Sequence, residues 1–139
     1  MIDDRWSLKW LIGESISEVE FLSESETWCI LLSRGSTLNV PCLWRLRLEG
    51  KLVATSSDHL HSFGLKELFD AAKVLREYSM GVPISSVEVD KGSLDLRIAF
   101  GPRLMLEILL ESAGYESWSA CHSSGVVVIA RGDGELISY

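Results

Sequence analysis

The sequence predicts an α+β protein that is predominantly antiparallel β, with two pseudo-repeated meander halves and one connecting amphipathic helix. From Ile16 onward, short runs of β-branched and aromatic residues alternate with Gly, Ser and Asp, which is typical of strands joined by tight turns. One segment alone changes to helical spacing, and it lies between two stretches that resemble each other. A length of 139 residues fits a single domain over residues 1–139.

Strands are expected on both sides of the helical segment. Each run is short and ends at a Gly, Pro, Ser or Asp, as strands in compact antiparallel sheets do. The expected strands are 16–22, 27–33, 37–41, 44–49 and 52–56 before the helix, and 84–90, 93–100, 103–110, 116–121, 126–131 and 135–139 after it.

From Leu65 onward, apolar residues recur at i, i+3, i+4, i+7 and i+10, which predicts an amphipathic helix over about 63–80. Ser62 or Gly64 is expected to begin it, and the Gly-Val-Pro sequence after Met80 to end it. Two pairs of opposite charge lie four residues apart on the expected exposed side: Lys66 with Asp70, and Lys73 with Glu77. We expect the apolar side to cover one face of a sheet.

The stretches before and after the helix share landmarks in the same order, which predicts two halves at about 11–57 and 82–131. In order, the landmarks are segments 16–21 and 84–89, Gly35 and Gly101, the alternating strands 37–40 and 103–106, Trp44 and Trp118, and Gly50 and Gly125. If the halves are related by a pseudo-twofold axis, the crevice between them is a natural place for a ligand or partner.

The composition is that of a globular protein, with 47% apolar residues, 24% charged residues and a net charge of −7. A negative surface repels phosphate backbones, so nucleic-acid binding is not expected. No apolar run reaches the roughly 18 to 20 residues that a membrane helix needs, and the N-terminus lacks a basic and apolar leader. A cytoplasmic location without membrane binding is therefore expected.

The negative charge is concentrated near the N-terminus, because residues 1–26 hold seven of the twenty acidic residues and only two of the thirteen basic ones. Such an acidic face would favour encounter with a basic protein, although a merely solvated surface has the same composition. Tryptophan is a frequent interface anchor, and two tryptophans lie in this segment. The predicted partner-binding residues are Trp6, Trp10, Glu18, Glu20, Glu24 and Glu26.

Catalytic and metal-binding patterns are weak. His59 and His61 would point the same way on a strand, but no third ligand has a defined spacing to them. Cys121 and His122 are adjacent, so a strand would point them to opposite faces. Glu18 and Glu20 could act as an acid and base pair, but a solvated or partner-facing edge accounts for them better. We therefore expect no enzyme activity, no metal and no cofactor.

The cysteines are Cys29, Cys42 and Cys121. Their number is odd and their spacing contains no CxxC pair, so neither a disulfide framework nor a zinc site is expected. Buried free thiols are the expected state.

The C-terminal part resembles a family of small bacterial proteins of unknown function. The resemblance rests on Gly114-Tyr115-Glu116-Ser117-Trp118, then Ser124-Gly125-Val126-Val127-Val128, then Gly132-Asp133-Gly134-Glu135-Leu136. Members typically have a Gly-Gly turn and a closing Trp, where this chain has Asp133 and Tyr139. The resemblance implies likeness to immunity-type proteins that accompany bacterial toxins. Its motif residues Tyr115, Glu116 and Trp118 are expected to form a structural corner.

Taken together, the sequence favours a non-enzymatic protein-binding domain with a basic protein as its expected partner, and the resemblance narrows this to an immunity-type inhibitor of a toxin. The alternative is a small-molecule-binding or sensing domain that uses the crevice between the halves. A homodimer is also left open, since an exposed edge strand can pair across a twofold axis.

Overall fold

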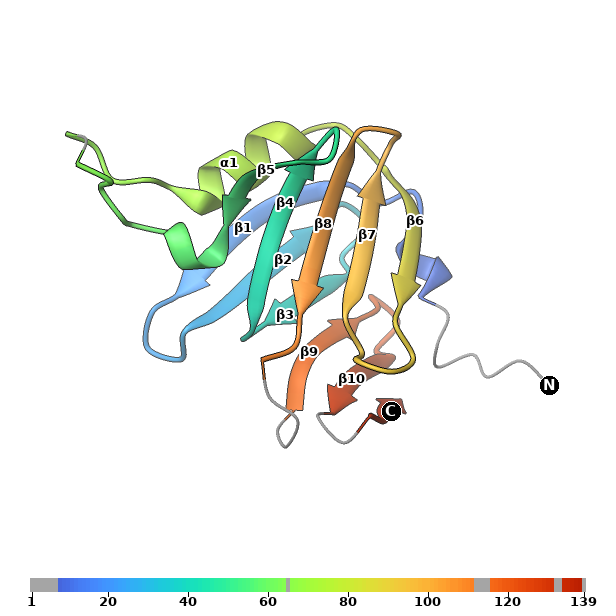
Figure 1. Ribbon diagram of the computed structural model, residues 1–139. Helices are drawn as coiled ribbons and strands as arrows, with labels where there is room; N and C mark the ends of the chain where they lie inside the picture. The colour runs from blue at the N-terminus through green and yellow to red at the C-terminus, as the bar shows by residue number, and fades with distance from the viewer. Residues whose placement is uncertain (1–7, 65, 112–115, 132–133, 139) are drawn as a thin grey trace.

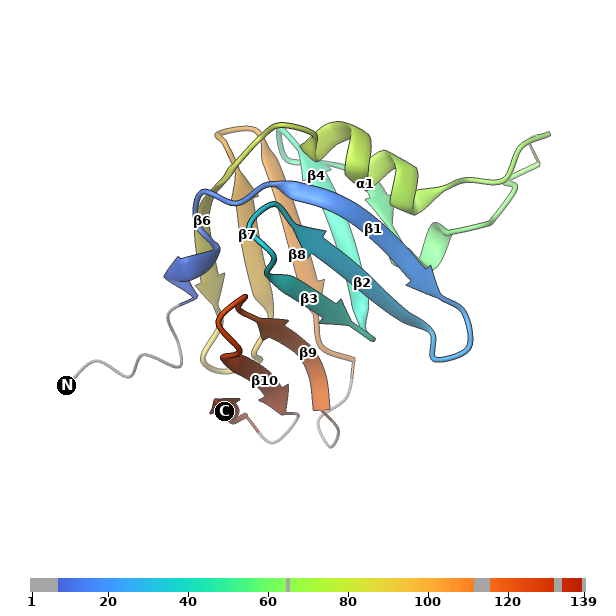
Figure 2. The ribbon, with the colours of Figure 1, turned by 180° about the vertical axis from the view of Figure 1, so that it is seen from behind.

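The computed structural model describes residues 8–64, 66–111, 116–131 and 134–138. Within them, two antiparallel sheets face each other (Figures 1 and 2), so the predicted α+β, mostly antiparallel class is confirmed. Sheet A has six strands in the order β1 (Ile16–Leu22), β2 (Thr27–Leu32), β3 (Thr37–Val40), β9 (Glu116–Cys121), β10 (Val127–Arg131) and β11 (Leu136–Ser138). Sheet B has five in the order β5 (Lys51–Thr55), β4 (Leu43–Leu48), β8 (Leu104–Leu109), β7 (Leu96–Phe100) and β6 (Ile84–Val89).

Each half of the chain contributes strands to both sheets. Strands β1 to β3 lie in sheet A and β4 and β5 in sheet B, whereas β6 to β8 lie in sheet B and β9 to β11 in sheet A. The middle of each sheet joins the halves, because β3 pairs with β9 and β8 pairs with β4. The halves are therefore interlocked rather than placed side by side as two separate meanders.

The chain crosses between the sheets where the sequence breaks the strand pattern. Pro41 follows β3 and Cys42 precedes β4, and the two strands belong to different sheets. Proline has no N–H to donate to the ladder, so it ends β3 and lets the chain turn toward sheet B.

Local geometry is shared between the halves. The register shifts at Ile16/Glu18 in β1 and at Ile84/Ser86 in β6. At these two bulges the hydroxyls of Ser17 and Ser85 donate to the neighbouring strand, at 3.0 Å to the Leu31 carbonyl and 3.2 Å to the Ala99 carbonyl. The same serine bridge thus fixes both bulges.

The pairing corrects one detail of the predicted alignment. Leu38 lies opposite Ile30, and Leu106 lies opposite Ile98, so residues 37–40 correspond to 105–108 rather than to 103–106. Gly35 is the third of the four residues between β2 and β3, whereas Gly101 is the first of the three residues between β7 and β8. Aligning the glycines therefore shifted the register by two residues.

One hydrophobic core fills the space between the sheets. Trp44 and Trp118 are fully buried at its centre, and both are 0% exposed. Alternate residues of the strands point inward to join them, as the burial patterns of β2 and β3 show. A core of this density leaves little room for a ligand between the sheets.

The helix is shorter than predicted and differently placed. α1 spans Ala71–Ser79 instead of about 63–80, and the side chain of Asp70 caps it by accepting from the Lys73 N–H at 3.0 Å. It packs against β1 and β5, the edge strands of the two sheets, so it closes one side of the sandwich instead of covering a sheet face (Figure 1). Burial of Leu75 there contributes about 1.5–3 kcal/mol.

The two predicted charge pairs of the helix have different outcomes. Lys73 and Glu77 are paired at 3.9 Å. Lys66 precedes the helix and Asp70 is its cap, so the other predicted pair does not lie on a helix surface.

A shorter element lies against the other side of the sandwich. The 3-10 helix η2 (Lys9–Leu11) packs against β6, and Leu8 and Leu11 are buried in the core. Within the part of the chain that the structure describes, no helix is long and apolar enough to cross a membrane.

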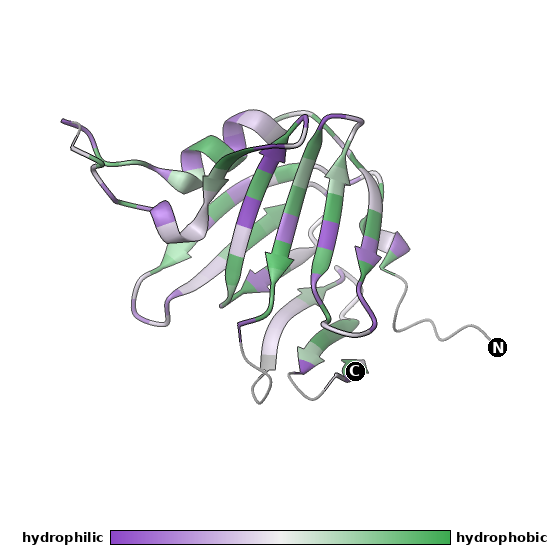
Figure 3. Ribbon diagram, viewed as in Figure 1, coloured by the Kyte–Doolittle hydropathy of each residue, from purple (hydrophilic) through white to green (hydrophobic). Residues whose placement is uncertain are grey.

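The outer face of sheet B is charged. On β4 two charged residues alternate with hydrophobic ones, and β7 and β8 each carry one charged residue among hydrophobic neighbours (Figure 3). The register places four charged residues in one row across the sheet, with alternating sign: Glu88, Arg97, Glu107 and Arg45. Glu107 is 6% exposed and accepts from the Arg45 Nε at 2.8 Å, so neighbouring charges of this row are paired with each other.

Candidate functional site

The segment before α1 forms a loop with a closed base. The Leu60 N–H donates to the Phe69 carbonyl at 2.7 Å, and the Phe69 N–H donates to the His61 carbonyl at 2.7 Å. Between these bonds the chain extends away from the sheets (Figure 1). We call residues 60–69, with Leu65 outside the described residues, the projecting loop.

Large apolar side chains of the projecting loop face solvent. Leu60, Phe63 and Leu68 are 54%, 62% and 57% exposed, although residues of this kind are normally buried. Leu60 and Phe63 also have φ angles of 64° and 50°, a left-handed conformation that costs bulky residues about 1–3 kcal/mol. Exposure and strain at the same residues indicate a surface that is kept for contact.

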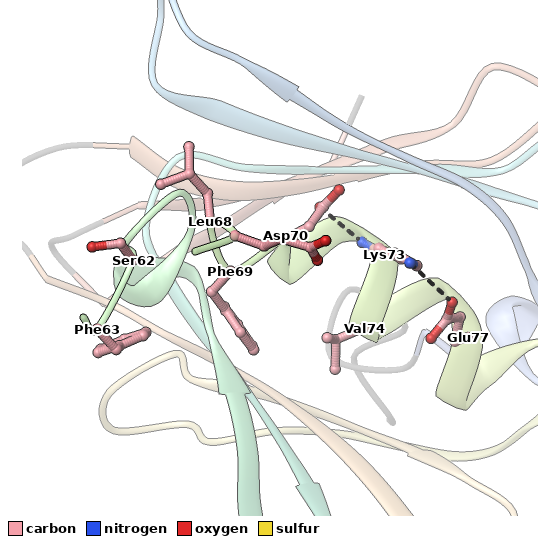
Figure 4. Close-up of a pocket in the computed structure, with 9 residues that line it drawn as sticks. Ser62, Phe63, Leu68, Phe69, Asp70, Lys73, Val74 and Glu77 are labelled. Carbon is pink, nitrogen blue, oxygen red and sulfur yellow. Dashed lines mark hydrogen bonds and ion pairs between the residues drawn. The ribbon is translucent and has the colours of Figure 1, made fainter. Parts of the chain in front are cut away.

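The projecting loop and α1 enclose a groove with a volume of about 490 Å³ (Figure 4). Phe63 and Phe69 reach it from the loop and Val74 from the helix, and the two phenylalanine rings are 6.2 Å apart in an edge-to-face arrangement. The lining is mixed, and its apolar part, which Leu68 completes, suits an aromatic or aliphatic side chain of a partner.

Charged residues border the groove: Glu67, Asp70, Lys73 and Glu77. Lys73 is the one basic residue among them, and its ammonium lies 3.9 Å from the Glu77 carboxylate. The border is therefore net negative, and it favours a partner segment that carries Lys or Arg beside its apolar anchor.

His59 holds the base of the projecting loop against the core. Its Nδ1 accepts from the Ala71 N–H at 3.1 Å, and its ring lies 4.8 Å from Trp28 and 5.4 Å from Phe21. Burial lowers the pKa of His59, and the nearby Asp70 carboxylate opposes that shift only in part. His59 is thus a neutral acceptor at the first turn of α1.

The other residues weighed for metal or nucleophilic chemistry are separated. His61 lies against Phe63, with ring centroids 5.9 Å apart, and does not share the position of His59. His122 Nδ1 lies 2.7 Å from the Ser124 Oγ in the turn before β10. Among the described residues, no group of three His, Cys, Asp or Glu side chains could hold a metal ion.

The predicted acidic residues lie along β1 and the turn after it. Glu18 and Glu20 point outward from sheet A, and Glu24 and Glu26 lie in the turn between β1 and β2. The Glu18 carboxylate is 3.6 Å from the Arg76 guanidinium of α1. Because α1 packs beside β1, the acidic residues lie on one flank of the helix and the groove on another.

The predicted tryptophan anchors do not join this site. Trp10 is half-buried against the core, with its ring edge-on to His122 at 5.0 Å, and η2 lies by β6 rather than by α1. Trp6 lies outside the described residues.

Trp118, one residue of the corner that the sequence predicts, lies in β9. It is fully buried, and its Nε1 donates to the Leu94 carbonyl at 2.7 Å. Glu116 begins β9, and Tyr115 lies outside the described residues.

Sequence reasoning missed the groove because it assigned residues 63–70 to the helix. That assignment placed Leu68 and Phe69 on the buried side of a helix, whereas the chain bends away from the sheets before α1 begins. The available signals were Asp70 as an N-cap candidate and Gly64 inside the proposed helix.

A smaller pocket of about 260 Å³ lies where the end of α1 meets sheet B. Its walls include Tyr78, Val82 and Phe100, and Arg103 at its border is bound to Glu49. This volume is below the roughly 300–1,000 Å³ of typical small-molecule sites.

Comparisons with protein-family models, curated proteins and solved structures find no match for this chain. The resemblance to immunity-type proteins therefore stays a prediction, and the surface chemistry of the chain carries the functional argument.

Proposed function

We propose that this chain is a non-enzymatic protein-binding domain that holds a basic segment of its partner in the groove between the projecting loop and α1. The observation that carries the proposal is the groove of about 490 Å³, with exposed Phe63 and Leu68 at its entrance and a net negative border. An apolar residue of the partner fills the groove, while neighbouring basic residues face Glu67 and Asp70.

The acidic strand extends the same interaction. Glu20 in β1 and Glu24 in the turn after it are exposed, and β1 is the strand against which α1 packs, so both add negative potential on this side of the molecule. Such a field raises the rate of encounter with a basic partner and weakens as salt is added. In its narrower form, which the sequence resemblance supports, the partner is a basic bacterial toxin and the domain inhibits it by covering its surface.

The alternative of a small molecule between the halves has less support. The space between the sheets is filled by the core, with Trp44 and Trp118 at 0% exposure. The groove, in contrast, is bordered by the most exposed large side chains of the projecting loop, and such surfaces are typical of protein contacts.

Quantitative affinity capture from the source organism tests the proposal. Phe63→Ser combined with Leu68→Ser removes the apolar entrance, and each lost apolar contact weakens binding by about 0.8–1.5 kcal/mol, half of complete side-chain burial. We expect a basic protein to be captured by the wild type and to be reduced at least tenfold with the double variant. Glu20→Lys combined with Glu24→Lys should slow association and reduce its dependence on salt.

The matched control is Met105→Ser, since Met105 is half-buried on the outer face of sheet B. It should capture the same partner as the wild type. Equal capture by the Phe63 and Leu68 double variant, or a captured partner with an acidic surface, would contradict the proposal.

A further inference from the structure

The outer face of sheet A differs in chemistry from the outer face of sheet B. The outward residues of its central strands are uncharged: Cys29, Leu31, Thr37, Asn39, Ser119 and Cys121. On β10 the face continues with Val127 and Ile129, which are half-buried. From β2 to β10 the result is a largely uncharged and partly apolar surface, bordered by Glu18 and Glu20 on β1 and by Arg131 at the end of β10.

The corresponding position in sheet B shows what a water-facing sheet looks like in this fold. Pairing places Cys29, Asn39 and Ser119 in one row of sheet A, where sheet B has Arg97, Glu107 and Arg45. Both rows occupy the same place in the shared topology. The topology therefore does not require an uncharged surface on sheet A, and its chemistry indicates a contact.

No described element lies over this face. Seen from the side of sheet A, strands β1, β2, β3, β9 and β10 stand in front with nothing across them (Figure 2). The described helices pack elsewhere: α1 lies against β1 and β5, η2 against β6, and the 3-10 helix η3 (Ser56–Asp58) against β4.

We propose that the outer face of sheet A binds a second copy of this chain, which makes the protein a face-to-face homodimer. Charge favours this pairing. With a net charge of −7, two copies repel each other overall, whereas the central strands of this face bring no like charges together.

The area of the outer face of sheet A also favours a dimer. Sheet A is six strands wide, and strand spacing of about 4.8 Å makes it roughly 29 Å across. Three rows of outward residues, about 6.8 Å apart, add roughly 20 Å along the strands. The face thus offers about 600 Å² before its relief is counted, close to the roughly 800 Å² per partner of standard interfaces.

The position of the acidic residues selects the symmetry axis. A twofold axis across the strands would place Glu18 and Glu20 of the two copies against each other. An axis along the strands, between β3 and β9, places β1 over the far edge of the second copy instead. This axis also places Leu31 opposite Val127 of the second copy, and Thr37 opposite Cys121 of the second copy.

Sedimentation velocity of the full chain under reducing conditions, at roughly 5 to 200 µM, tests the proposal. We expect the wild type to be a dimer. Thr37→Glu should raise the dissociation constant of the dimer at least tenfold and so give a monomer, because the substitution would bury a charge beside the axis. Met105→Glu is the matched control, since Met105 holds the equivalent place on sheet B, and it should remain dimeric. Circular dichroism melting confirms that both variants fold.

Two outcomes overturn the proposal. A wild type that is monomeric at the highest concentration excludes the homodimer, and loss of a captured foreign protein by Thr37→Glu would then assign the face to that protein. A dimer that Thr37→Glu leaves intact points to pairing through an edge strand instead. Neither outcome depends on the groove, which lies on the α1 side of the molecule.

Discussion

Single residues decide how the projecting loop is attached to the sandwich. His59 accepts from the Ala71 N–H, packs against Trp28, and so joins the loop, the first turn of α1 and the core. This role requires the neutral imidazole, because a protonated Nδ1 has no lone pair to accept with. Acidification should therefore weaken the attachment of the projecting loop to α1 and the core.

The lowered pKa of His59 determines the direction in which pH changes the stability of the folded chain. The unfolded chain binds the proton near the ordinary value of 6.5, and the folded chain only at lower pH, so the stabilisation is complete above 6.5. It is lost as pH falls through the lowered pKa. We predict that the free energy of unfolding falls between pH 7 and pH 5.5 in the wild type.

Urea unfolding at several pH values measures this effect. His59→Gln should flatten the pH dependence across that window, while His61→Gln, in the same loop, should keep the wild-type slope. An unchanged slope in His59→Gln would show that His59 is not the titrating group.

The two central tryptophans offer a second residue-scale comparison. Both are fully buried, yet Trp118 Nε1 donates to the Leu94 carbonyl, whereas Trp44 Nε1 has no hydrogen-bond partner among the described residues. Removing one partner of a buried hydrogen bond costs about 1–3 kcal/mol. We predict that Trp118→Phe lowers the free energy of unfolding by about 1–2 kcal/mol more than Trp44→Phe, as measured by denaturant titration.

Both substitutions remove the same volume, so the cavity cost is matched and the difference reports on the hydrogen bond. An equal loss of stability in both variants, or a larger loss for Trp44→Phe, would show that the hydrogen bond of Trp118 does not stabilise the core.

At the scale of elements, strand positions could be predicted because alternation and turn residues act locally. The start of β7 is the exception: it begins at Leu96 rather than 93, because Asp90 accepts from the Gly92 and Ser93 N–H groups and extends the turn. The start of α1 could not be predicted from apolar spacing alone. Leu68 continues the helical pattern, but it is exposed in the projecting loop.

The sheet to which each strand belongs is a longer-range property. Pro41 marks the place where β3 ends, but a proline does not say whether the next strand pairs with its predecessor or crosses to another sheet. On the side away from β2, β3 pairs with β9, which lies far along the chain. Such pairing is decided by packing of the whole core, with Trp44 and Trp118 in its middle.

At the scale of the whole molecule, the candidate surfaces are distributed over different sides. The groove and the acidic strand flank α1. No described element covers the outer face of sheet A, and the outer face of sheet B carries a row of paired charges. The acidic residues of β1 were foreseen from the concentration of charge near the N-terminus. The groove was not, since it arises from the bend between Phe63 and the cap of α1.

This distribution would allow the proposed dimer and the proposed partner complex to form together. A dimer through sheet A leaves both copies of the groove open, because the groove borders α1 and not the outer face of β3 or β9. The proposed function nevertheless concerns the groove, which is proposed to bind a basic partner.

Site-specific photo-crosslinking in living cells of the source organism tests that claim most directly. A benzophenone amino acid in place of exposed Phe63 keeps an aromatic ring at the groove, and the same group in place of Met105 serves as the control on sheet B. The account predicts that the probe at Phe63 captures one basic protein that the probe at Met105 does not. Capture of no protein from Phe63, or of the same proteins from both positions, would contradict it.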